Sequence, residues 1–166
     1  MQLNHYTSNF KKKQFPITLV CDNVTNAPNV GSLFRTADAF GVEHIIFCGS
    51  AIPRGRKMTK TSRSAEKAVN FQEIEHIENA ITYLKLKGYY CVALEITSKS
   101  SNLMSLTFPK QKPLALIIGD ENFGISQAVL DAMDHVVHIE MFGQNSSMNV
   151  VQATSITLYE MTKQLS

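Results

Sequence analysis

Short apolar runs alternate along the chain with segments in which apolar residues recur every three or four positions. Continuous apolar runs rich in β-branched residues predict buried strands, and the spaced pattern predicts amphipathic helices. We expect strands at 17–21, 44–48, 89–96, 114–119 and 135–141, and helices within 26–41, 75–87 and 149–164. Because strands alternate with helices, the pattern predicts an α/β fold, a mostly parallel sheet flanked by helices. The polar stretch 97–112 is expected to be a loop with at most a short helical turn.

The helix expected within 26–41 carries one arginine in an informative position. Its apolar face is formed by Val30, Leu33, Phe34, Ala37 and Phe40. At 100° per residue, Arg35 lies roughly 150° from the centre of that face. The periodicity leaves two interpretations open, a solvated charge paired with Asp38 and a charge required by a functional site.

Length and composition favour one domain with a hydrophobic core. The chain has 166 residues, of which 44% are hydrophobic. We predict a single domain over 1–166, with 1–15 as an N-terminal extension. No run of about 18 apolar residues predicts a membrane span, and no apolar secretory segment stands at the N-terminus. Three cysteines without close spacing are expected to be buried thiols in a reducing compartment, which indicates a cytoplasmic protein (Cys21, Cys48 and Cys91).

Positive charge is concentrated in one segment, although the net charge is only +2. The segment 54–67, read as a loop, carries the basic residues Arg54, Arg56, Lys57, Lys60, Arg63 and Lys67. A second small cluster lies at 11–13. Such clusters suit phosphates, but either one alone is better explained as a solvated loop, unless other features of the chain indicate a nucleic-acid substrate. The histidines have no metal-ligand spacing, so no metal site is predicted.

Three polar loops follow predicted strands, at 21–31, 119–126 and 141–151. In a parallel sheet, ligands bind beyond the carboxyl ends of the strands, where such loops meet. Asparagine and serine in each loop are also ordinary turn and cap residues. None of the loops has the phosphate-loop or dinucleotide pattern. Their joint occurrence therefore predicts a ligand site of another kind.

In sequence and order, the three loops resemble the signature motifs of the SpoU-type (TrmH family) RNA ribose 2′-O-methyltransferases of the SPOUT superfamily. The first motif is matched by Asn29, Gly31, Arg35 and Phe40–Gly41, and the second by Gly119, Glu121 and Gly124. The third is matched by Ile139, Met141, Gly143 and 147–150. Glu140 departs from the family pattern, which usually has proline there. The resemblance extends from Ile17 almost to the end of the chain.

The resemblance implies a fold, a reaction and partners. The fold is expected to be an α/β knot with a C-terminal trefoil knot, without a separate RNA-binding domain. The expected activity is S-adenosylmethionine-dependent methylation of a ribose 2′-hydroxyl in structured RNA, by a homodimer and without a membrane or a metal. A tRNA substrate is favoured. The alternatives are ribosomal RNA, or a non-catalytic RNA-binding or assembly factor with the same fold.

The resemblance also assigns residues. It implies that the cofactor contacts Leu94, Glu95, Gly119, Gly124, Ile139, Met141, Ser147 and Met148. It implies catalytic roles for Arg35, Asn29, Glu121, Ser147 and Asn149. The basic segment is expected to bind RNA through Arg54, Arg56, Lys57, Lys60 and Arg63. Since a guanidinium stays protonated at neutral pH, we interpret Arg35 as a clamp for phosphate and developing negative charge rather than as a base.

Overall fold

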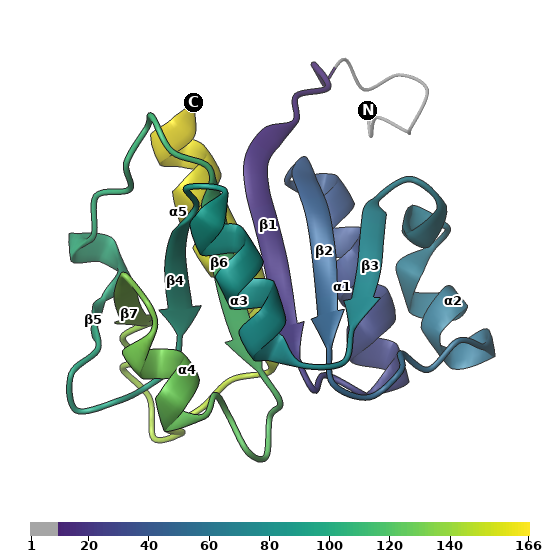
Figure 1. Cartoon of the computed structure of the whole chain (residues 1–166). Helices are drawn as coiled ribbons and strands as arrows, with labels where there is room; N and C mark the ends of the chain where they lie inside the picture. Colours follow the sequence, from purple (N-terminus) through teal and green to yellow (C-terminus); the bar gives the residue numbers. More distant parts are fainter. Residues whose placement is uncertain (1–9) are drawn as a thin grey trace.

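A computed structural model describes residues 10–166 of the chain (Figure 1). The first part of the expected N-terminal extension, residues 1–9, lies outside the described residues, and so does His5. Residues 10–14 precede the first strand and have no regular secondary structure.

The described strands form one seven-stranded sheet in the order β3-β2-β1-β6-β4-β7-β5, and every pairing is parallel. Their bounds are β1 Phe15–Asp22, β2 Val42–Cys48, β3 Asn70–Ile74, β4 Tyr90–Leu94, β5 Ser101–Asn102, β6 Leu114–Gly119 and β7 His135–His138. The central strands β1 and β6 are buried over nearly their whole length. This explains their continuous apolar sequences, because a parallel strand is covered on both faces.

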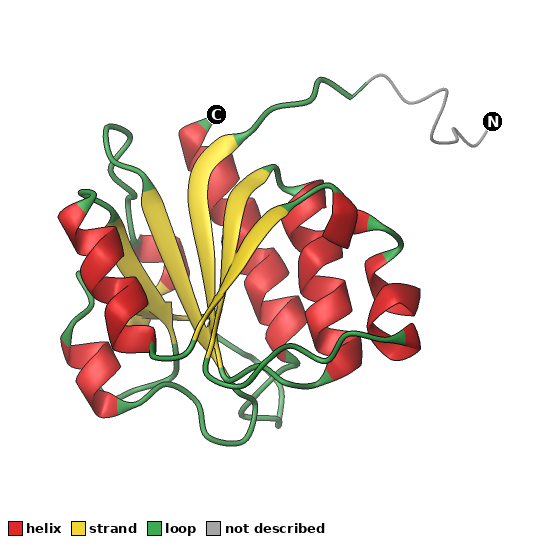
Figure 2. Cartoon of the chain, turned by 45° about the vertical axis from the view of Figure 1, so that its right-hand side comes forward, coloured by secondary structure: helices red, strands yellow, loops and turns green. Residues whose placement is uncertain are grey.

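Helices cover both faces of the sheet (Figures 1 and 2). The helices are α1 Ala27–Ala39, α2 Arg56–Ser62, α3 Ile77–Leu86, α4 Gln127–Asp131 and α5 Val150–Leu165. Buried residues of α1, α2 and α5 belong to one core cluster, and those of α3 and α4 belong to a second. Side chains of β1 alternate between the clusters, with Leu19 in the first and Val20 in the second. The predicted mostly parallel α/β architecture is confirmed, whereas the trefoil knot stays a prediction.

The predicted elements are all present, but several elements were missed. Strands β3 and β5 and helix α4 were not expected. In addition, the interpretation of segment 54–67 as a loop was wrong, because it contains α2 and a 3-10 turn at Ala65–Lys67. Helix α2 buries only Met58 and Ser62, which are four residues apart and share one face. Two buried positions among basic residues do not give a recognisable amphipathic pattern. Within the described residues, no helix is both long and apolar enough to span a bilayer.

Helix α2 packs closely on α1 at a glycine. A Cβ atom added to Gly31 would lie 2.1 Å from the carbonyl oxygen of Met58 and 2.1 Å from Oγ1 of Thr61. The Thr61 hydroxyl also donates to the carbonyl oxygen of Pro28 at 3.0 Å. The glycine of the first motif therefore allows α1 and α2 to approach each other.

The three cysteines are free and buried, as predicted. Burial, with the nearby Asp22 and Glu78 carboxylates, raises the pKa of Cys48 to about 12. Burial also raises the pKa of Cys91 to about 11, with a smaller contribution from Asp134. Thiols in this state are unreactive at neutral pH, which fits the expected role as small core residues.

Candidate functional site

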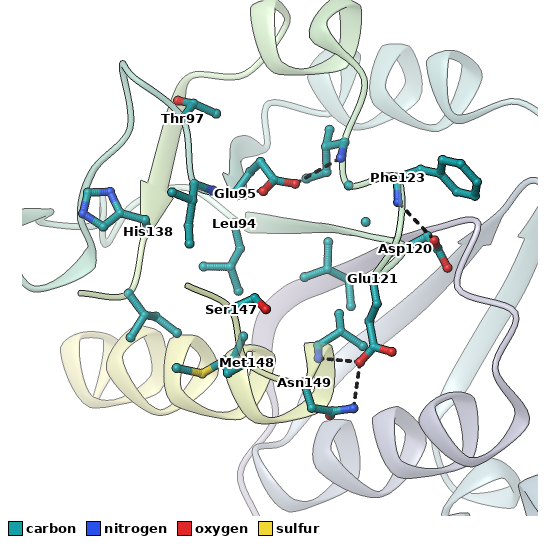
Figure 3. Close-up of a pocket in the computed structure, with 18 of the residues that line it drawn as sticks. Leu94, Glu95, Thr97, Asp120, Glu121, Phe123, His138, Ser147, Met148 and Asn149 are labelled. Atoms are coloured by element: carbon teal, nitrogen blue, oxygen red, sulfur yellow. Dashed lines mark hydrogen bonds between the residues drawn. The ribbon is translucent and has the colours of Figure 1, made fainter. Parts of the chain in front are cut away.

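Hydrogen bonds join the three motif loops at one point. The side-chain amide of Asn149 donates to Oδ1 of Asn29 at 3.1 Å and to Oε1 of Glu121 at 2.8 Å. The same carboxylate oxygen accepts the backbone N–H of Val150 at 3.2 Å, as Figure 3 shows. The predicted convergence of the loops is thus present, with Glu121 and Asn149 at its centre.

Local helix capping positions these residues. The side chain of Asn26 accepts the backbone N–H of Asn29 at 3.1 Å and begins α1. At the start of α5, Oδ1 of Asn149 accepts the N–H of Val151 at 2.9 Å. The side chain of Asn149 therefore caps its own helix with its oxygen and links the other two motifs with its nitrogen.

A cleft of about 860 Å³ lies beyond the carboxyl ends of β4, β6 and β7 (Figure 3). All the residues predicted to contact a cofactor line it, namely Leu94, Glu95, Gly119, Gly124, Ile139, Met141, Ser147 and Met148. Of the predicted catalytic residues, Glu121, Ser147 and Asn149 line it. The cleft is large enough to enclose a ligand of small-molecule size.

The second motif loop is compact and needs both of its glycines. The backbone N–H of Gly124 donates to the carbonyl oxygen of Asp120 at 2.8 Å. A Cβ atom on Gly119 would lie 2.5 Å from the carbonyl of Gly124. Gly124 has a φ of +63°, and its missing Cβ leaves room for Oε2 of Glu95, which would otherwise be 2.5 Å away.

Glu95 connects the end of β4 to this loop. Its Oε1 accepts the N–H of Ile96 at 3.0 Å, and its Oε2 accepts the N–H of Ile125 at 3.1 Å. Both carboxylate oxygens are thus engaged with backbone groups. Glu95 fixes the wall of the cleft as well as lining it.

The charges around the cleft are of one sign. Glu95, Asp120 and Glu121 line it, and none of the described residues that line it is lysine or arginine. This arrangement favours a ligand that carries positive charge and disfavours a triphosphate. Asp22 lies nearby at the end of β1, where it pairs with Gly119 of β6. Burial raises the pKa of Asp22, and the Glu78 carboxylate raises it further. A hydrogen bond from the side chain of Asn23 lowers this pKa and partly opposes the shift.

Sequence reasoning missed several lining residues. His138 lines the cleft, and its Nδ1 lies 2.9 Å from Oγ of Ser100. Thr97 lines it as well. The resemblance implied a cofactor contact at Ile139, so the adjacent end of β7 was a usable signal for His138. Thr97 follows directly after the predicted strand 89–96, which was the signal for that residue.

Asn29 and Arg35 were predicted to be catalytic but do not line the cleft. Asn29 reaches the site through Asn149. The side chain of Arg35 is exposed and makes no hydrogen bond or ion pair with residues 10–166. Arg35 lies one turn beyond Gly31, which contacts α2, and residues four apart share a helix face. From this spacing we infer that Arg35 lies on the side of α1 that faces α2.

The basic segment is not uniform. Arg54 pairs with Glu73 and lies over the ring of Phe71. The remaining predicted RNA-binding residues are exposed and form no ion pair within the described part of the chain (Arg56, Lys57, Lys60 and Arg63). Glu140, the departure from the family pattern, accepts a hydrogen bond from Asn102 at 2.6 Å and is not among the residues that line the cleft.

Comparisons with known proteins show which family the chain belongs to. The model of the SpoU rRNA methylase family matches residues 16–159, so the chain belongs to this family. The tRNA (guanosine(18)-2′-O)-methyltransferase of Aquifex aeolicus is 27% identical over 93% of this chain and 72% of its own length. The 23S rRNA (guanosine-2′-O-)-methyltransferase RlmB of Blochmanniella floridana is 30% identical over 93% of this chain and 60% of its own length.

The fold is shared with solved structures of the family. The crystal structure of the A. aeolicus TrmH/SpoU tRNA modifying enzyme matches with a TM-score of 0.82 and 27% identity. The match covers 92% of this chain and 77% of that one. These likenesses support the resemblance that the three motifs indicate.

Proposed function

We propose that this protein transfers a methyl group from S-adenosylmethionine to a ribose 2′-hydroxyl of a structured RNA. The observation that carries the proposal is the hydrogen-bonded junction of Asn29, Glu121 and Asn149 at the mouth of the cleft. All three motifs of the SpoU family contribute to it. The activities of the relatives, on tRNA and on 23S rRNA, support the reaction class.

The cleft fits this cofactor on its own chemistry. Apolar side chains, among them Leu94, Ile139 and Met148, offer surfaces for an adenine ring. The carboxylates that line the cleft favour a sulfonium and an ammonium group. S-adenosylmethionine supplies an activated methyl group when it is bound there. The chain then has to hold the RNA hydroxyl in line and stabilise charge on its oxygen.

We assign these tasks to the motif residues. Asn149 and Glu121 fix the start of α5 and the second loop, and Asn29 positions the ribose. Arg35, with the exposed cations of α2, binds phosphates of the RNA. In this proposal Arg35 acts as a clamp from the surface of α1, which its exposed position beside α2 supports.

The finer parts of the proposal follow the family resemblance. We propose tRNA as the substrate, with ribosomal RNA as the alternative, and a homodimer as the functional form. A cytoplasmic location and a reaction without a metal are part of the same proposal. The free, buried cysteines support a reducing compartment.

Mapping 2′-O-methyl positions in total RNA from cells with and without the gene tests the function. We expect one position, in tRNA, to lose its methyl group. The purified protein should then restore that group on RNA from the deficient cells. If no position changes and no methyl group is transferred in vitro, the catalytic proposal is wrong. Calorimetry separates the remaining alternative, because a non-catalytic assembly factor need not bind S-adenosylmethionine.

Arg35→Ala tests the clamp. We expect methyl transfer to fall at least 100-fold while the affinity for S-adenosylmethionine stays within about twofold, because Arg35 is outside the cleft lining. Arg35→Lys should recover only part of the activity, since lysine cannot bind a phosphate through two parallel bonds. Transfer by Arg35→Ala at a rate close to that of the unmodified protein would contradict the assignment.

A further inference from the structure

An exposed phenylalanine lies at the rim of the cleft. The side chain of Phe123 is 90% exposed, although the residue lines the cleft. Figure 3 shows its ring pointing outward from the second motif loop, away from Leu94 and Ser147. An aromatic ring left in water at this position requires an explanation, because burying it would be favourable.

The loop that carries Phe123 is held in place by its own hydrogen bonds. Oδ1 of Asp120 accepts the N–H of Asn122 at 2.8 Å and the N–H of Phe123 at 3.3 Å. A bridge pairs Asp120 with Gly124 and closes the turn. The ring is therefore presented by a braced turn, which lowers the entropy cost of binding something to it.

The same loop reaches the place where the substrate is expected. Glu121, two residues before Phe123, bonds to Asn149, which bonds to Asn29. A ribose positioned by this junction carries its nucleobase within reach of the rim. Unstacked RNA bases are commonly bound by stacking on aromatic side chains.

We propose that Phe123 stacks on a nucleobase of the RNA, either the base of the methylated nucleotide or that of an immediate neighbour. This inference rests on the proposed function and specifies its substrate as RNA with a base face accessible at that place, in a loop or at a helix end. Phe123 is then a positioning residue that orients the nucleotide whose ribose accepts the methyl group.

Steady-state methyl transfer to unmethylated tRNA from the gene-deficient cells provides the first test. Loss of one base–aromatic stack corresponds to about 5- to 150-fold in affinity. We expect Phe123→Ala to raise the KM for RNA within this range, with a smaller change in kcat. Phe123→Tyr and Phe123→Trp should retain a KM close to that of the unmodified protein. Phe123→Leu, which is apolar but cannot stack, should behave like Phe123→Ala.

Phe142→Ala is the matched control. Phe142 is 91% exposed on the third motif loop but is not among the residues that line the cleft. We expect its removal to leave the KM for RNA within about twofold. An equal rise in KM for both variants would contradict a specific role for Phe123.

Abasic transcripts provide the second test. After the methylated nucleotide has been mapped, its base or a neighbouring base is removed in turn. For one of these abasic transcripts, the unmodified protein and Phe123→Ala should have the same KM, because the base that stacks on Phe123 has been removed. An undiminished effect of Phe123→Ala on every abasic transcript would overturn the inference.

The remaining outcomes separate the possible contacts of Phe123. If Phe123→Ala weakens S-adenosylmethionine binding in calorimetry, the ring contacts the cofactor and the inference is wrong. A change in sedimentation coefficient would instead place the ring against a second copy of the chain, which also contradicts it. If Phe123→Ala is active and its KM for RNA is unchanged, the stacking inference is wrong, but the proposed function is not affected. An unmodified protein that transfers no methyl group refutes the proposed function itself.

Discussion

At the scale of single residues, the site depends on one carboxylate. Glu121 accepts from both the side chain of Asn149 and the backbone of Val150, so it fixes the second loop to the start of α5. These contacts give direct support to a role for Glu121 in fixing the loop. The motif spacing indicated that Glu121 belongs to the site but could not indicate its partners, which are 28 and 29 residues away.

Glu121→Ala should weaken both the cofactor cleft and the fold. We expect the free energy of unfolding to fall by about 1 kcal/mol, since these bonds lie near the surface, and S-adenosylmethionine affinity to fall about tenfold or more. Glu121→Gln keeps one acceptor and should lose less of each. Urea denaturation and calorimetry measure the two effects.

Asp131→Ala provides the control for Glu121. Asp131 also accepts a side-chain hydrogen bond, from Gln127 at 2.7 Å, but it lies on α4 and does not line the cleft. Its removal should leave cofactor affinity unchanged. If Glu121→Ala binds the cofactor as tightly as Asp131→Ala does, the junction is not what shapes the cleft.

At the scale of elements, the sequence predicted those strands and helices whose buried residues recur at a regular spacing. The central strands β1 and β6 and the helices α1, α3 and α5 were recognised because their apolar residues repeat over many positions. Strand β3 was missed because its sequence, NFQEI, is mostly polar and lies at the edge of the sheet. Helix α2 was missed because it buries few residues and its exposed residues include the cations Arg56, Lys57 and Lys60. Their placement depends on tertiary contacts that a local pattern does not contain.

The contact between α1 and α2 is a further consequence of one glycine. Gly31→Ala would place a Cβ atom against backbone and side-chain oxygens of α2, at Met58 and Thr61. We expect α2 to shift and the free energy of unfolding to fall by about 1–3 kcal/mol, as for other overpacked contacts. Because α2 carries the exposed cations, RNA affinity should also fall, with a shallower dependence on salt.

Gly55→Ala is the matched substitution for Gly31→Ala. Gly55 precedes α2 and has nothing within 4 Å of an added Cβ, and its φ of 168° is extended backbone that alanine adopts. Thermal unfolding and filter binding at several salt concentrations compare the two variants. Equal stability and equal RNA binding for Gly31→Ala and Gly55→Ala would contradict the importance of the close helix contact.

At the scale of the whole molecule, α1 connects the two functional surfaces. Its first turn contributes Asn29 to the junction at the cleft, and the next turn contacts α2 through Gly31. In the proposed function, S-adenosylmethionine binds in the cleft and the RNA phosphates bind near α2. Helix α1 contacts both places and holds them at a fixed separation. This arrangement fits the proposal that Arg35 serves the reaction from outside the cleft lining.

The last helix has a second exposed side that fits the proposed homodimer. The structure buries Val150, Leu158 and Met161 of α5 in the core. Ala153 lines the cleft, whereas Ile156 is 43% exposed and Tyr159 is 61% exposed. An apolar side of a long helix left in water is typical of an interface. Contact along α5 would also bring the second subunit close to the cleft.

Ile156→Arg should therefore dissociate the dimer, because a charge buried in an apolar interface is strongly unfavourable. We expect sedimentation equilibrium at micromolar concentration to give twice the chain mass for the unmodified protein and the chain mass for the variant. Leu86→Arg is the control, since Leu86 is 82% exposed on α3 and should leave the mass unchanged. A monomeric unmodified protein, or a dimeric Ile156→Arg variant, would refute the interface on α5. A monomeric variant that still folds should also show weaker methyl transfer, which would connect dimer formation to the cleft beside α5.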